Sequence, residues 1–312
     1  MQVMTYTPDA PMNIGTRGSP LALAQAYETR ARLMAALDLP EDAFKIHAIK
    51  TTGDRVQDRA LAEIGGKALW TKELDFALDA GEIYCAVHSM KDVETIRPAE
   101  FAIAAMLERA DVRDRLVGAA SIDALKHGAR VGTASPRRTA QLLRLRPDLS
   151  IGLIRGNVAT RLARIESGEF DATLLAAAGL SRLGEEVGTP IPVKTLLPAP
   201  SQGAIGIECC AGDEALVRFL AAIDHEPTSR CVRVERAFLE ALGADCHSPV
   251  AAQAEVTEGD GWHFTARLYS GDGAQMIEGA CAGAGGDHTP AAALARRMLS
   301  EAHPEIAKLF PG

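Results

Sequence analysis

Aromatic residues, long apolar runs and an excess of positive charge are scarce or absent in this sequence. Only 4% of the 312 residues are aromatic, which leaves little material for a platform of stacked nucleic-acid bases. The formal net charge of -8 at pH 7 gives nucleic-acid binding no bulk electrostatic support. No segment approaches the ~18 consecutive apolar residues of a membrane-spanning helix. We therefore expect neither nucleic acid nor a membrane as a partner.

The cysteines also lack the spacing of a metal site. The chain has 6 of them, and none forms a C-x-x-C pair or is combined with an H-x-x-x-H pair. Residues 1–12 have neither the basic start nor the apolar core of a secretory signal. We therefore expect no metal, free thiols rather than disulfides, and a cytoplasmic localisation.

The remaining composition is typical of a globular protein with two or three domains, since 47% of the residues are hydrophobic and 24% are charged. Short apolar segments that suit buried strands alternate with helical segments, which predicts an α/β fold. The alternation is interrupted by a charge run at 108–115, by prolines between 190 and 200, and near Pro227. We predict domain 1 at 12–107 and 203–223, domain 2 at 108–202, and an α+β domain 3 at 224–312.

Polar side chains follow a buried strand in the segment 83–92, IYCAVHSMKD. Ligands bind at the carboxyl ends of strands in an open α/β sheet, so Ser89, Lys91 and Asp92 are predicted to border a crevice. An ordinary strand-to-helix turn with solvated charges would show the same pattern. His88 is a weaker candidate, because a single histidine near a strand end usually has a structural role.

A strand end, a glycine-containing turn and a capped helix with a nearby arginine occur together at 15–19, 132–138 and 155–161, and the predicted caps are Ser19, Ser135 and Asn157. Thr71 is likewise predicted to cap a helix over 72–80, and 290–309 is predicted to be a single closing helix. Helix N-termini attract anions, and arginine binds carboxylates through two parallel hydrogen bonds. If these strands share a sheet edge, the repeats predict a cleft for a ligand with many carboxylates or phosphates. Within it Asp92 would stabilise positive charge that develops during a reaction, or move protons.

Cys246 lies in a predicted loop between a helix and a strand, where a thiol is accessible, and His247 follows it. A passive loop cysteine would have the same surroundings in the sequence. Two classes of function fit these residues: an enzyme acting on a polyanion, and a binding or sensory module for a polyanion. The loop cysteine and the third domain favour the enzyme.

Taken in order, these motifs resemble the porphobilinogen deaminase (hydroxymethylbilane synthase) family over nearly the whole chain. The matching stretches are 16–22, 65–67, 86–92, 137–138, 153–162, 178–180, 202–204 and Cys246. The resemblance implies two lobes similar to type II periplasmic binding proteins, with the active site in the cleft between them, followed by a C-terminal α+β domain. It also implies a monomer.

The resemblance further implies a transferase of tetrapyrrole and heme biosynthesis. Such an enzyme deaminates porphobilinogen, adds four units head to tail to a dipyrromethane primer, and releases hydroxymethylbilane by hydrolysis. It implies that the dipyrromethane cofactor is joined by a thioether to Cys246, that Asp92 is the catalytic group, and that no metal is needed. Eleven residues are implied to bind cofactor and substrate carboxylates: Arg17, Ser19, Lys67, Ser89, Lys91, Ser135, Arg137, Arg138, Arg155, Arg161 and Arg182.

The chain departs from the family's usual pattern at several positions. Lys67 belongs to a polar, glycine-punctuated stretch, 51–70, that we expect to be a mobile loop or lid; there Glu63 replaces a lysine and Trp70 a phenylalanine. Pro136 replaces a leucine, and Asp245 replaces a glycine directly before Cys246. The pair Pro200-Ser201 stands where a glycine-containing pair is commoner, so the stiffness of a hinge there is expected to differ.

Overall fold

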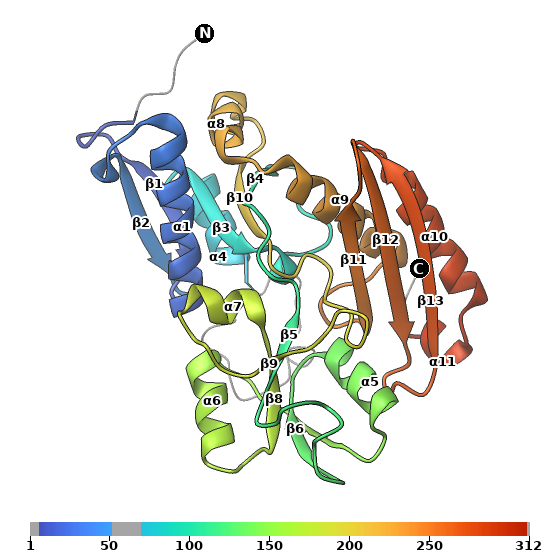
Figure 1. Cartoon of the computed structure of the whole chain (residues 1–312). Coiled ribbons are helices and arrows are strands. Elements are labelled where there is room, and N and C mark those ends of the chain that lie inside the picture. Colours follow the sequence, from blue (N-terminus) through green and yellow to red (C-terminus); the bar gives the residue numbers. More distant parts are fainter. Residues whose placement is uncertain (1–5, 52–69, 311–312) are drawn as a thin grey trace. The chain divides into compact units, whose positions relative to one another are not determined.

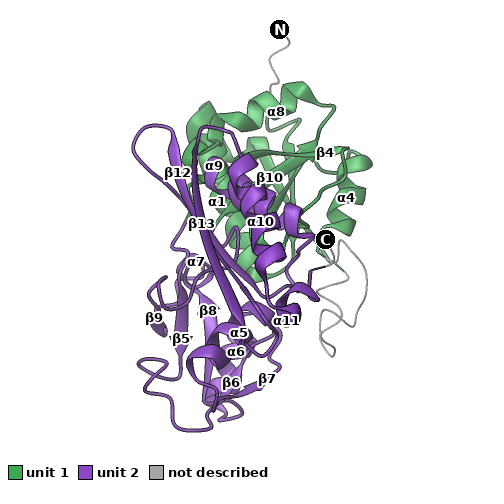
Figure 2. Cartoon of the chain, turned by 90° about the vertical axis from the view of Figure 1, so that its right-hand side faces the viewer, with its two compact units in different colours: residues 1–58, 64–109, 204–229 green, residues 59–63, 110–203, 230–312 purple. Residues whose placement is uncertain are grey.

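The computed structural model describes residues 6–51 and 70–310 (Figure 1). These residues divide into two compact units, shown in green and purple in Figure 2. Unit 1 contains the described residues up to 109 together with 204–229, and unit 2 contains 110–203 and 230–310. Among the described helices, none has the length and apolar character needed to cross a membrane. All six cysteines are free thiols, as expected.

Unit 1 is built on one mixed sheet. Its strands are β1 (Met12–Arg17), β2 (Phe44–Ile49), β3 (Cys85–Ser89), β4 (Phe101–Met106) and β10 (Ile205–Cys210). Its helices are α1 (Pro20–Leu37), η1 (Glu41–Ala43), α4 (Lys72–Asp79), η2 (Met90–Asp92), α8 (Glu214–Leu220) and η3 (Ala221–Ile223). The strand order is β2-β1-β3-β10-β4; β1 is parallel to β2 and β3, and β10 is antiparallel to β3 and β4.

The helix starts of unit 1 follow local sequence signals in one case and tertiary contacts in another. The Ser19 hydroxyl accepts a hydrogen bond from the Ala22 amide, and Pro20 is the first residue of α1. Thr71 is the N-cap residue of α4, as predicted, but its hydroxyl makes no capping hydrogen bond and donates to the Glu94 carboxylate instead. A charged acceptor from another segment has therefore replaced the local cap.

The first part of unit 2 repeats the same strand arrangement. Its elements are β5 (Asp114–Val117), β6 (Arg130–Gly132), α5 (Pro136–Leu145), β7 (Ser150–Gly152), α6 (Val158–Glu166), β8 (Ala172–Ala176), α7 (Ala177–Arg182) and β9 (Thr189–Pro190). The order is β7-β6-β8-β5-β9, with β6 parallel to β7 and β8, and β5 antiparallel to β8. In both sheets the second strand in the order, β1 or β6, lies between two parallel partners, and the fourth, β10 or β5, is antiparallel to the third. In unit 1 that strand, β10, is distant in sequence.

The C-terminal part of the chain is a separate α+β region. Its elements are α9 (Glu226–Leu242), β11 (Val250–Val256), β12 (Gly261–Tyr269), β13 (Met276–Ala284), α10 (Thr289–Glu301) and α11 (Pro304–Ala307). The sheet β11-β12-β13 is antiparallel. Its core contains Phe238 of α9 together with Trp262 and Phe264 of β12. The single helix expected over 290–309 is two helices, since Pro304 has no amide hydrogen with which to continue α10.

The two repeated sheets and the third sheet confirm the predicted fold class of two α/β lobes followed by a C-terminal α+β region. The exact boundaries of three domains stay a prediction. Ser201, in the segment predicted as a hinge, has a left-handed backbone with φ 64°, where glycine would carry less strain. Its amide donates to the buried Glu235 carboxylate, which also accepts from the Ala254 amide of β11. Through Glu235, these two bonds connect the segment to α9 and β11.

Candidate active site

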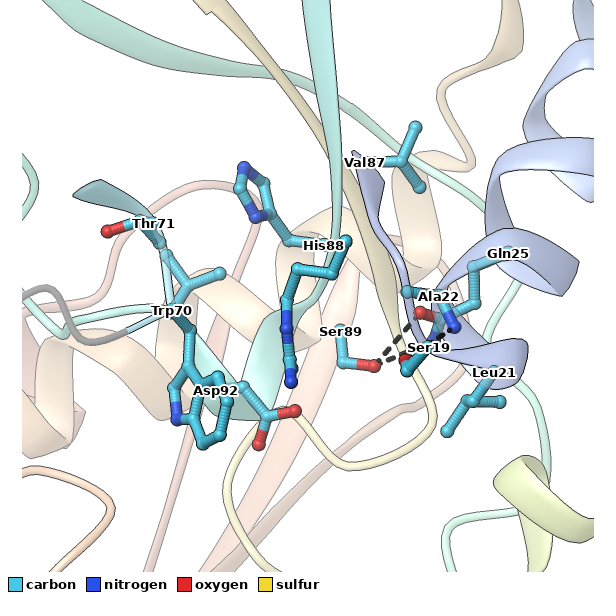
Figure 3. A pocket seen from close by; sticks show the side chains of 12 residues that line it. Ser19, Leu21, Ala22, Gln25, Trp70, Thr71, Val87, His88, Ser89 and Asp92 are labelled. Carbon is cyan, nitrogen blue, oxygen red and sulfur yellow. Dashed lines mark hydrogen bonds between the residues drawn. The ribbon is translucent and has the colours of Figure 1, made fainter. Parts of the chain in front are cut away.

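Unit 1 contains a pocket at the carboxyl ends of β1 and β3 (Figure 3). These strands are parallel neighbours, with Gly15 opposite Ala86, so their ends emerge at one edge of the sheet. The Ser89 hydroxyl and the Gln25 amide are joined by hydrogen bonds of 2.7 and 3.1 Å, which link the end of β3 to α1. The pocket is lined by Arg17, Ser19, Leu21, Ala22, Gln25, Trp70, Thr71, Val87, His88, Ser89, Asp92 and Val93.

Four predicted site residues thus meet in one pocket: Arg17, Ser19, Ser89 and Asp92. The Asp92 carboxylate and the Trp70 indole ring are both among its walls (Figure 3). The Arg17 guanidinium carbon lies 3.9 Å from the centroid of Trp70, a cation–π contact. A guanidinium held by its face can still direct N–H donors at a carboxylate ligand. The pocket therefore offers a cation for an anionic ligand and an acid for a centre that becomes positive.

Two further residues, Lys91 and Lys67, were predicted to bind carboxylates. Lys91 is half-buried in η2, the turn that carries Asp92. Lys67, Glu63 and most of the predicted lid lie outside the described residues.

Behind the pocket lies an ion cluster that the sequence did not reveal. His88 Nε2 is 3.0 Å from Glu208 Oε2, and both side chains are buried. The Arg97 guanidinium donates to both Glu208 oxygens at 2.7 and 3.0 Å, and further to Glu94 and Asp75. Burial alone would raise the pKa of Glu208, but His88 and Arg97 hold it at about 2. His88 thus has the structural role that was expected of it, although its ring also lines the pocket. The available signal was a lone carboxylate inside an apolar strand, which requires a buried partner.

In unit 2 the two adjacent arginines of α5 are buried against one carboxylate. Arg137 Nη2 is 2.7 Å from Asp114 Oδ2, and Arg138 Nη2 is 2.7 Å from Asp114 Oδ1. Burial would raise the pKa of Asp114, but the two guanidinium groups hold it well below its usual range. Ser135 caps α5, as predicted, by accepting a hydrogen bond from the Arg138 amide. The sequence predicted ligand carboxylates for these arginines and did not foresee Asp114.

The other three arginines of unit 2 that were predicted to bind carboxylates, Arg155, Arg161 and Arg182, are half-buried near glycine turns. Arg161 Nε donates to the Gly156 carbonyl at 3.0 Å, and Arg182 Nη2 donates to the Gly203 carbonyl at 3.2 Å. Gly156 has φ 99°, and a Cβ there would lie 2.8 Å from Thr160 Cγ2, so only glycine fits between Arg155 and the start of α6. The turn therefore keeps Arg155 and Arg161 at one helix start.

Cys246 is exposed in the loop between α9 and β11. Its sulfur lies 3.6 Å from His247 Nδ1, and the Asp245 carboxylate accepts a hydrogen bond from the His247 amide at 2.8 Å. Hydrogen bonding to Asp245, and then to Cys246, raises the pKa of His247 to about 10. A cationic imidazolium therefore lies beside an accessible sulfur at neutral pH.

We expect an NMR titration to find His247 protonated well above pH 6.5, with a midpoint near pH 10. Because the folded-state pKa is raised, the pairing stabilises the loop fully below about pH 6.5, and this stabilisation is lost as the pH rises through about 10. Asp245→Asn, which removes the charged acceptor, should move the midpoint back toward 6.5. A midpoint at or below 6.5 in the unaltered protein would contradict the pairing.

Comparisons with known proteins identify the family of the chain. Residues 12–218 match the family model described as "Porphobilinogen deaminase, dipyromethane cofactor binding domain", and residues 229–302 match "Porphobilinogen deaminase, C-terminal domain". The chain is 58% identical over 310 residues to porphobilinogen deaminase of Sphingopyxis alaskensis, covering 97% of this chain and 98% of that protein. It is 50% identical over 280 residues to the Paracoccus denitrificans protein of the same name, covering 88% of this chain and 89% of the relative.

Among solved structures, the periplasmic VFT2 domain of Bordetella pertussis BvgS is 16% identical, with a TM-score of 0.39; the match covers 68% of this chain and 86% of that domain. The likeness at the sequence level is far closer, and it extends over both matched domains. The chain therefore belongs to the porphobilinogen deaminase family.

Proposed function

We propose that this chain deaminates porphobilinogen and joins four units head to tail on a covalently held dipyrromethane, releasing hydroxymethylbilane by hydrolysis. The observation that carries the proposal is the pocket of unit 1, where the Asp92 carboxylate and the Arg17 guanidinium line one cavity at the carboxyl ends of β1 and β3. In a module that only binds a polyanion, a carboxylate lining the pocket would repel the ligand, whereas an enzyme can use it to stabilise positive charge that develops during the reaction. The family membership of the chain supports the same conclusion.

The pocket residues have distinct tasks in this reaction. The substrate carries an acetate and a propionate, so Arg17, Ser19 and Ser89 of the pocket would hold carboxylates. Lys91, which lies in η2 next to Asp92, would do the same. Asp92 is half-buried in the pocket, and its carboxylate is the group that can stabilise a positive charge on the substrate. Its carboxylate stabilises the positive charge that develops on a pyrrole N–H, and its oxygens hold or pass on the proton that is released.

The residues present fit the family's dipyrromethane. The exposed Cys246 thiol is accessible for a thioether bond, and its sulfur lies 3.6 Å from Nδ1 of the neighbouring His247. The buried Nε–H groups of Arg137 and Arg138 have no hydrogen-bond partner among the described residues, which suits an anionic ligand. When bound, this group supplies the pyrrole ring to which the first substrate unit is added.

The wider assignments belong to the same proposal. Ser135, Arg155, Arg161 and Arg182 of unit 2, and Lys67, would bind further carboxylates of the growing chain. We also propose that the enzyme works as a monomer in the cytoplasm, on a small-molecule substrate alone, with the three domains that the sequence predicts.

Intact-mass spectrometry of the purified protein tests the proposal. We expect a mass above that of the bare sequence by two pyrrole units, and formation of hydroxymethylbilane when porphobilinogen is added. The two readouts belong together because the covalent primer is required before any unit can be added. A protein that has the bare sequence mass, and that added hydroxymethylbilane cannot prime, would contradict the enzyme function.

A further inference from the structure

Asp114, the first residue of β5, joins two guanidinium groups and is fully buried. Each carboxylate oxygen accepts one of the 2.7 Å bonds from the arginine pair of α5. The Gln202 side-chain amide donates a third bond to Oδ1 at 3.0 Å and a fourth, of 2.7 Å, to the Val112 carbonyl. Asp114 therefore lies at the centre of a cluster that joins β5, α5 and the segment before β10.

The cluster leaves one positive charge uncompensated. Two guanidinium groups share a single carboxylate, so the sum of the three charges is +1. Burial of an unbalanced charge is costly unless another negative group completes the site. Arg137 and Arg138 are only 3% and 6% exposed, so bulk solvent does little to reduce that cost.

Each guanidinium is also fixed at two points. Besides its bond to Asp114, Arg137 donates through Nη1 to the Leu197 carbonyl at 2.7 Å, and Arg138 donates through Nη1 to the Leu174 carbonyl at 2.8 Å. With both Nη atoms engaged, the rotation of each plane is set. These bonds use two of the five N–H donors of each guanidinium. The buried Nε–H of each is among the remaining donors and has no partner among the described residues.

We propose that Asp114 is a positioning residue for substrate binding. It orients Arg137 and Arg138 and neutralises one of their charges, and a carboxylate of the bound oligopyrrole supplies the second negative charge and an acceptor for the remaining donors. The inference rests on the proposed function and goes beyond it, because Asp114 itself touches no ligand. Asp114 acts only through the two arginines.

Asp114→Asn tests this role, with Glu235→Gln as its matched control. Both changes turn a fully buried carboxylate of unit 2 into an amide, but Glu235 accepts from the backbone amides of Ser201 and Ala254. Both variants should lose thermal stability. Only Asp114→Asn should raise KM for porphobilinogen, by about tenfold, with a much smaller change in kcat, since one charge-assisted hydrogen bond is worth roughly that factor.

The measurements are Tm by circular dichroism, the loaded fraction by intact mass, and KM and kcat on the loaded protein. If Asp114→Asn is not recovered folded, Gln202→Ala replaces it, since it loosens Asp114 from one side; KM should then rise about threefold. Unchanged KM in the folded variant, or an equal rise in Glu235→Gln, would overturn the positioning role while the proposed function stands. An unloaded, inactive wild-type protein would overturn both.

Discussion

Asp92→Asn is expected to leave the fold intact and to lower kcat by roughly a thousandfold, the scale of losing one preorganised electrostatic group in an active site. Asparagine keeps the size of the side chain but cannot carry the negative charge that stabilises a positive pyrrole nitrogen, nor hold the released proton. Binding should change much less than turnover, because Arg17, Ser19 and Ser89 remain in the pocket. The expected signature is therefore a fall in kcat with KM within a few-fold of the original value.

Steady-state kinetics, with circular dichroism to verify folding, measure this effect. Asp79→Asn is a suitable control, since Asp79 is an exposed carboxylate at the end of α4 in the same unit. It should retain full activity. Near-normal kcat in Asp92→Asn would remove Asp92 from the chemistry and leave the pocket as a binding site only.

Cys246→Ser is expected to abolish both the covalent cofactor and the activity. A serine hydroxyl ionises far less readily than a thiol, so it gives no comparable nucleophile at neutral pH even beside the His247 cation. The loop is exposed, and the substitution removes no core contact, so the protein should fold normally. Intact mass should equal that of the sequence alone, and no product should form from porphobilinogen.

Cys281→Ser provides the matched control, since Cys281 is also a free thiol of the C-terminal region and is half-buried in β13. This variant should retain the added mass of two pyrrole units and its activity. Persistence of that mass in Cys246→Ser would show that another residue holds the cofactor, and the role of the Cys246 loop would have to be abandoned.

The local elements around the site could be predicted because their causes lie within a few residues. Ser19, Ser135 and Asn157 each accept a hydrogen bond from an amide three positions ahead, and these residues were identified as caps from the sequence. The same holds for β3, whose apolar residues suit a strand buried on both faces. The polar groups that follow this strand predicted that Ser89 and Asp92 border a crevice, and both line the pocket of unit 1.

Two predictions of local structure differ from the structure, and the reasons are different. Thr71 was expected to cap α4 with its hydroxyl, but that hydroxyl donates a hydrogen bond to the Glu94 carboxylate, 23 residues away in sequence. The C-terminal helix was expected to be continuous, and Pro304 divides it. This second signal is local, since the missing amide hydrogen of Pro304 outweighs the helical pattern around it.

By itself, the sequence determined the α/β alternation, the helix caps, the cationic character of the strand ends and the accessibility of Cys246. Only the tertiary structure decided which charges meet: His88 with Glu208 across 120 residues, and Asp114 with Arg137 across 23. The physical reason is the separation in sequence between the interacting groups. A helix cap or an apolar period depends on neighbours in the chain, whereas the partner of a buried charge is selected by whichever strands the sheet brings together.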